Sequence, residues 1–61
     1  MTLKWFAERL NPEVELNIYR RGTWRTPIKA GDVNKSQYAD MKIADFNFKG
    51  HGDRCYVKLE S

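Results

Sequence analysis

Alternation of apolar and polar residues in three separate stretches is the strongest constraint that this sequence places on its fold. A period of two residues is typical of a β-strand with one buried face. In the middle stretch the alternation slips by one residue at Ala44 and Asp45, where a β-bulge would restore a single inward face. The apolar positions are Val14, Leu16 and Ile18 in the first stretch, Met41, Ile43, Phe46 and Phe48 in the second, and Cys55, Val57 and Leu59 in the third.

Turn-forming residues between these stretches predict two β-hairpins. Arg21-Gly22 favours a tight turn, and residues 23–28 after it are rich in β-formers, so we expect them to pair with the first stretch. Pro27 has no amide hydrogen, and this second strand should therefore lie at a sheet edge or end near Thr26. Residues 50–53 contain two glycines and predict the loop of the second hairpin.

Residues 30–40 predict a connection between the hairpins. Residues 30–32 (Ala-Gly-Asp) have turn chemistry, and the polar stretch 34–40 has room for one helical turn. The candidates for the N-cap of that turn are Asp32, Asn34 and Ser36.

The N-terminal residues have the spacing of a short helix. Thr2 is available as its N-cap, and Asn11-Pro12 ends the element, because the residue before a proline is pushed out of the α region. Trp5 lies off the apolar face, so an alternating strand that uses Trp5 is the rival interpretation. The residues at i, i+3, i+4 and i+7 are Leu3, Phe6, Ala7 and Leu10.

These elements predict an α+β fold in a single small domain that spans residues 1–61. In this fold a short N-terminal helix packs on one face of a four-stranded antiparallel sheet made of the two β-hairpins. The other face of the sheet is left open to solvent or a partner. A small open β-barrel is the alternative arrangement of the same strands.

The single cysteine and the lack of a long apolar run both indicate where the protein is located. Because Cys55 has no partner in the chain, an intrachain disulfide is excluded and a reducing compartment is the natural interpretation, so we expect a cytoplasmic protein. No apolar run approaches the roughly 20 residues that span a bilayer, and no membrane association is predicted.

Charge is distributed unevenly along the chain. The formal net charge is +3, and six bases face three acids in residues 1–31, whereas five bases meet five acids in residues 32–61. Residues 19–31 hold four bases and no acid, interleaved with aromatic rings, which favours contact with phosphates and unpaired bases. The candidate contact residues are Tyr19, Arg20, Arg21, Trp24, Arg25, Lys29 and, from the last strand, Tyr56.

Catalysis and metal binding have little support in the sequence. His51 and Cys55 are close in sequence, but the histidine falls in a glycine-flanked loop and the cysteine points inward from a strand, so they do not predict a nucleophilic pair. Zinc generally takes four ligands of the Cys/His type, and the chain has one of each. We therefore expect a protein that is not an enzyme and that needs no cofactor or metal.

Two functions follow from these observations as hypotheses. The first is a small nucleic-acid-binding accessory protein that binds DNA or RNA through its basic, aromatic β-hairpin. The alternative is a protein-binding inhibitor or adaptor module, of the type found in phages or mobile elements, that presents exposed aromatics and an edge strand to an acidic protein surface. In either case we expect a monomer or a weak homodimer.

Overall fold

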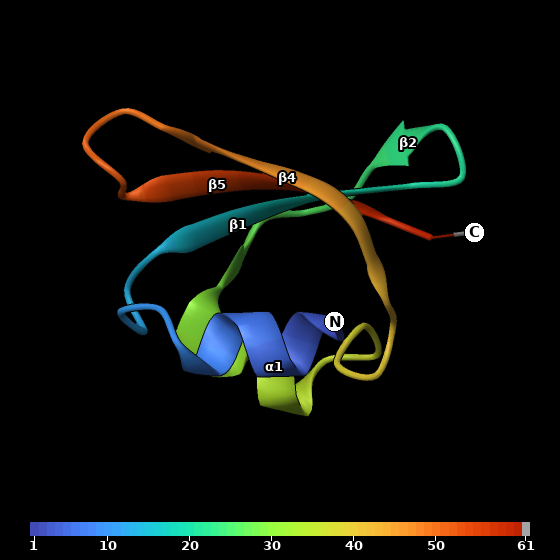
Figure 1. The fold of residues 1–61 in the computed structure, drawn as a ribbon, viewed down its shortest axis with the longest axis horizontal. Coiled ribbons are helices and arrows are strands. Elements are labelled where there is room, and N and C mark those ends of the chain that lie inside the picture. Colours follow the sequence, from blue (N-terminus) through green and yellow to red (C-terminus); the bar gives the residue numbers. More distant parts are fainter. Residues whose placement is uncertain (61) are drawn as a thin grey trace.

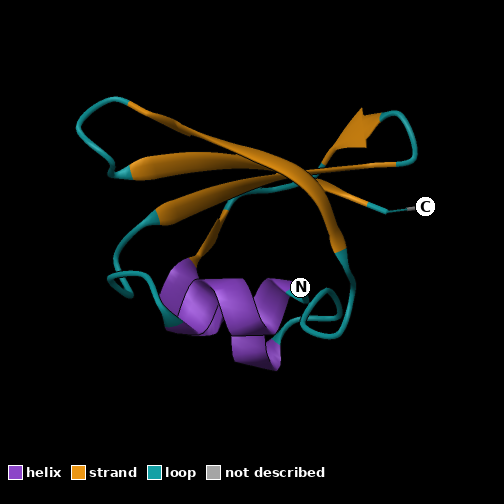
Figure 2. Cartoon of the chain, viewed as in Figure 1, coloured by secondary structure: helices purple, strands orange, loops and turns teal. Residues whose placement is uncertain are grey.

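A twisted β-sheet forms one layer of the structure, and two short helices form the other (Figure 1). The computed structural model describes residues 1–60. Both helices lie on the same side of the sheet, which leaves the opposite face uncovered (Figure 2). The elements in chain order are α1 (Leu3–Glu8), β1 (Glu15–Arg20), β2 (Thr23–Trp24), β3 (Ile28–Lys29), the 3-10 helix η1 (Ala30–Lys35), β4 (Ile43–Lys49) and β5 (Arg54–Leu59).

The sheet is mixed and has five strands. Its order is β2-β1-β5-β4, with β3 also paired to β1, and the central strands β1 and β5 are parallel. The α+β class is confirmed, but the prediction of four antiparallel strands is wrong, because alternation shows which face a residue occupies and not the direction of the neighbouring strand. The sheet is open, with β2 and β4 at opposite edges, so the barrel alternative is wrong as well.

The first hairpin turns where the sequence predicted. Arg21 and Gly22 both have positive φ, of 53° and 78°, as a two-residue hairpin turn with the twist of its flanking strands requires. The turn pairs Tyr19 with Trp24. The returning strand breaks after Trp24 and resumes at Ile28, so Pro27 lies in a gap of the ladder. This gap confirms the expected interruption and accounts for the fifth strand.

The second hairpin contains the predicted bulge. The register of β4 against β5 shifts between Ile43 and Asp45, which leaves Ala44 unpaired. Beyond the shift, Phe46 pairs with Val57 and therefore lies on the same face of the sheet as Ile43 does before it. The bulge thus allows one strand with two alternation phases to keep a single inward face.

Helix α1 begins at its predicted cap. The Thr2 hydroxyl accepts a hydrogen bond from the Trp5 backbone amide at 3.1 Å, which satisfies one of the free donors of the first turn. The predicted apolar face is buried at Leu3, Phe6 and Ala7, whereas Trp5 is exposed. The helical interpretation of the N-terminal segment is confirmed.

The connection between the hairpins differs from the prediction. Helix η1 begins already at Ala30, its N-cap is Lys29, and no side chain caps it, so the expected N-caps Asp32, Asn34 and Ser36 are wrong. Ser36 instead closes the C-terminal end, where its hydroxyl donates to the Val33 carbonyl at 2.7 Å. The apolar side chains of Ala30 and Val33 are buried in the core, and this burial decides where the helix lies.

The core lies between the sheet and the two helices. Strands β1 and β5, the parallel pair, form the sheet side of the core. Their residues Leu16, Ile18, Cys55 and Val57 are fully buried. The remaining buried residues are Leu3, Phe6, Ala7, Val14, Ala30, Val33, Tyr38, Ile43 and Leu59.

Gly31 lies where η1 packs closely against the segment that follows α1. Its amide donates to the Pro12 carbonyl at 3.0 Å, and a methyl group added at Gly31 would lie 2.9 Å from the ring carbon Cβ of Pro12. We expect Gly31→Ala to lower the free energy of unfolding by about 1–3 kcal/mol, because a rigid ring cannot move aside easily. Urea denaturation measures this change. The control Asn34→Ala, at an exposed position of the same helix, should change it by less than about 0.5 kcal/mol.

Candidate binding site on the outer face of the sheet

The outer face of the sheet is formed by the side chains that alternate with the core residues. Because both helices cover the other side, no element of residues 1–60 packs over this face (Figures 1 and 2). The strand pairings place on it Glu15, Asn17 and Tyr19 of β1, Trp24 of β2, Arg54, Tyr56 and Lys58 of β5, and Asp45, Asn47 and Lys49 of β4.

Three of the predicted contact residues form an aromatic cluster on this face. The ring centroid of Trp24 lies 5.0 Å from that of Tyr19 and 5.5 Å from that of Tyr56, in edge-on arrangements at 66° and 83°. Such T-shaped contacts are favourable because the positive edge of one ring meets the negative face of another. Trp24 remains 51% exposed, and the two tyrosines are half-buried. The aromatic cluster (Tyr19, Trp24 and Tyr56) therefore holds an exposed indole in a defined position.

Basic side chains surround the aromatic cluster, and some of them were missed by the sequence prediction. The Lys58 ammonium lies 5.7 Å from the centroid of the Tyr19 ring, within the range of a cation–π interaction. Arg54 and Lys49 follow it on the same face. Alternation showed that Lys58 shares a face with Tyr56, but only the parallel register of β5 against β1 brings it next to Tyr19. Two acids, Glu15 and Asp45, lie on the same face.

The three predicted arginines lie at the end of the sheet beside the aromatic cluster. Arg21 is exposed at the tip of the first hairpin. Arg20 follows Tyr19 and so projects toward the opposite face by alternation. Arg25 is half-buried, and its guanidinium lies 3.5 Å from the Arg20 carbonyl. Of the three, Arg21 is the one that is both exposed and beside the aromatic cluster.

Lys29 lies away from the aromatic cluster. It pairs with Glu15 at the opposite end of β1 from Tyr19, and its ammonium forms an ion pair with the Glu13 carboxylate at 3.0 Å. The hydrogen bond and the negative charge of Glu13 raise the pKa of Lys29. Within residues 1–60 this is the one ion pair that forms, so the bases on the outer face have no carboxylate within 4.0 Å.

Cys55 and His51 occupy different environments. The Cys55 side chain is fully buried on the inner face, as predicted, and its thiol lies 4.0 Å from the Tyr56 carbonyl. His51 is exposed in the turn between β4 and β5. Among residues 1–60, no three His, Cys, Asp or Glu side chains gather closely enough to hold a metal ion.

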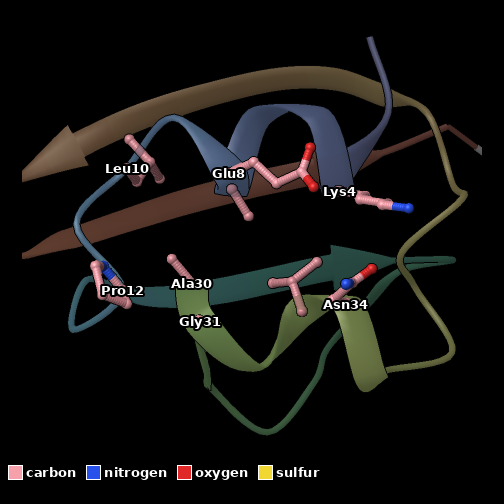
Figure 3. A pocket seen from close by; sticks show the side chains of 9 residues that line it. Lys4, Glu8, Leu10, Pro12, Ala30, Gly31 and Asn34 are labelled. Carbon is pink, nitrogen blue, oxygen red and sulfur yellow. The ribbon is translucent and has the colours of Figure 1, made fainter.

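A shallow groove of about 250 Å³ separates α1 from η1 on the other side of the molecule. Figure 3 shows Leu10 and Pro12 at one end of it and Lys4 and Asn34 at the other. Buried core residues, among them Ala7 and Val33, form its base. The polar side chains that line the groove, Lys4, Glu8 and Asn34, are all exposed to solvent and are not positioned by other side chains as the rings of the aromatic cluster are, so the outer face is the stronger candidate.

Comparison of the chain with protein-family models, with curated proteins and with solved structures found no match. Among residues 1–60, neither helix has the length and apolar character needed to cross a membrane. The candidate site therefore depends on geometry and chemistry alone.

The buried thiol makes stability depend on pH. Burial raises the pKa of Cys55 above its ordinary value near 9.0, although a hydrogen bond from the Asn47 backbone amide opposes the shift. As the pH rises, the Cys55 thiol ionises in the unfolded chain before it ionises in the folded chain. The stability that comes from burying the neutral thiol is therefore complete below the unfolded pKa and is lost as the pH rises toward the folded pKa.

We therefore expect the free energy of unfolding to fall above about pH 9, by at most about 1.4 kcal/mol per pH unit from this group. Urea denaturation at a series of pH values measures the effect. In Cys55→Ala this component is absent, while the titration of lysines and tyrosines is retained as a common background. Identical pH profiles for the two proteins would contradict the expectation.

Proposed function

We propose that this protein binds single-stranded nucleic acid through the outer face of its sheet. The observation that carries the proposal is the aromatic cluster, in which Tyr19 and Tyr56 hold Trp24 in place with half of its surface exposed. An exposed aromatic ring gives an unpaired base a flat surface on which to stack, and each such contact contributes about 1–3 kcal/mol. A ring that is already positioned loses little conformational entropy on binding.

The charges around the aromatic cluster support the same proposal. Lys58 and Arg54 flank the rings on β5, and Arg21 projects from the adjacent hairpin tip, all of them outside any ion pair of the described residues. Ammonium and guanidinium groups that form no ion pair are available to phosphates, whose binding releases condensed counterions. An open sheet face that combines stacking rings with bases suits a single strand, because the bases of a duplex are already stacked on one another.

Removal of the exposed indole tests the stacking contact. Trp24→Ala should weaken binding to single-stranded DNA or RNA by about 5- to 150-fold, because one base loses its aromatic partner. Trp5→Ala is the matched control, since Trp5 is similarly exposed at 48% but lies on α1, where Arg9 covers its ring at 3.7 Å. Fluorescence anisotropy with labelled oligonucleotides measures both variants. Equal losses in the two variants would show that the aromatic cluster is not the site.

Salt dependence tests the phosphate contacts. The logarithm of the binding constant should fall linearly with the logarithm of the salt concentration, and Lys58→Gln and Arg21→Gln should each reduce the slope by about 0.7. Lys35→Gln, at an exposed position of η1, should leave the slope unchanged. An affinity that is indifferent to salt, or the capture of a stoichiometric acidic protein from a nuclease-treated lysate with no oligonucleotide binding, would favour a protein ligand instead.

A further inference from the structure

Strand β4 forms an edge of the sheet and exposes two aromatic rings there. It is the last strand in the order β2-β1-β5-β4, so one side of its backbone has no strand partner along Phe46–Phe48. Phe46 and Phe48 lie on the inner face beside Phe6, with ring centroids 4.8 and 6.1 Å from it, yet 42% and 41% of their surfaces remain exposed. An exposed edge with large apolar side chains favours pairing with another strand.

The backbone groups of Phe46 and Phe48 are the ones that face this free edge. In an antiparallel ladder the amides of successive residues point alternately to the two sides of a strand. The Glu60 amide donates to the Lys42 carbonyl at 2.9 Å and the Ile43 amide donates to the Met1 carbonyl, so the Ile43 amide faces away from β5. The bulge adds one residue to β4, and the Asn47 amide therefore points toward β5. The Phe46 amide bonds instead to its neighbour's side chain, the Asp45 carboxylate, at 2.9 Å. The backbone amides and carbonyls of Phe46 and Phe48 are therefore available to a further strand.

Residues 45–49 read Asp-Phe-Asn-Phe-Lys, and this segment is complementary to itself in the antiparallel direction. With Asn47 at the centre, Asp45 of one copy lies opposite Lys49 of the other, and Phe46 lies opposite Phe48. We propose that β4 pairs with β4 of a second copy of this chain about a two-fold axis at Asn47. The sheets of the two copies then continue into one another.

In this register the side chains on both faces of β4 and the free backbone groups of its edge all gain partners. On the outer face it makes two Asp45–Lys49 ion pairs, and on the inner face it covers the exposed phenylalanine rings with one another. Phe46 exchanges backbone hydrogen bonds with Phe48 of the second copy, which replaces the bond from its amide to Asp45 and leaves that carboxylate to Lys49 of the second copy.

Charge complementarity favours a second copy over an unrelated strand. A lysine on an edge strand normally discourages pairing, and Lys49 protects the edge against a neutral or basic peptide. The self-complementary register places an acid opposite that lysine, so the same residue promotes the symmetric dimer. Because the interface is two-fold, both β4 edges are used and association ends at the dimer. Pairing of the two β4 strands does not require nucleic-acid binding.

Sedimentation equilibrium of the full chain, with charge reversals on β4, tests the dimer. The wild-type chain should dimerise reversibly at concentrations up to about 1 mM. Asp45→Lys places lysines opposite each other and Lys49→Asp places acids opposite each other, so each variant alone should raise the dimer dissociation constant about tenfold or more. An equimolar mixture of the two variants should form a heterodimer, because each lysine then meets an acid.

Matched reversals on η1 serve as controls, and circular dichroism confirms that every variant is folded. Asp32→Lys and Lys35→Asp make the same changes in net charge at exposed positions away from β4, and they should leave the dimer constant unchanged. A wild-type chain that stays monomeric at 1 mM would overturn the proposal. So would single β4 variants that dimerise like the wild type, or a mixture that stays monomeric, which would indicate an unrelated partner or no partner for this edge.

Discussion

The parallel pairing of β1 with β5 is the interaction on which the rest of the structure depends. It joins Glu15 to Arg54, residues that are 39 positions apart in the sequence (54 − 15), and it connects two hairpins that would otherwise be separate. A two-stranded hairpin alone is marginal in water, because it cannot bury an apolar face. Only when β1 and β5 meet do Leu16, Ile18 and Val57 form a surface that α1 and η1 can cover.

The same pairing assembles the candidate binding site on the opposite face. Tyr56 reaches Trp24, and Lys58 reaches Tyr19, because β5 lies against β1 in parallel register. The acid-free stretch of the sequence does not become one patch in space. Its last base, Lys29, is neutralised by Glu13 at the far end of β1, and bases of the second hairpin take its place beside the rings. A cluster of charge along a chain thus need not be a cluster on the surface.

Much of the fold was predictable because it depends on local chemistry. The Thr2 cap, the turn at Arg21-Gly22 and the bulge at Ala44 each follow from the conformational preferences of a few adjacent residues. The direction of β5 was not predictable, because a period of two assigns residues to faces and is the same for parallel and antiparallel neighbours. The start of η1 was missed for a related reason: burial of Ala30 and Val33, a tertiary effect, outweighed the local capping preferences of Asp32 and Ser36.

The first residues of the chain already occupy part of the β4 edge. Thr2 forms an antiparallel bridge with Lys42, and the Met1 carbonyl accepts a hydrogen bond from the Ile43 amide at 2.9 Å. Residues added before Met1, such as an affinity tag, would be directed along β4 past the bulge and toward Phe46. Tethered there, even a weakly pairing tag has a high effective concentration and competes with any strand that arrives from solution. The position of a tag thus controls access to this edge of the sheet.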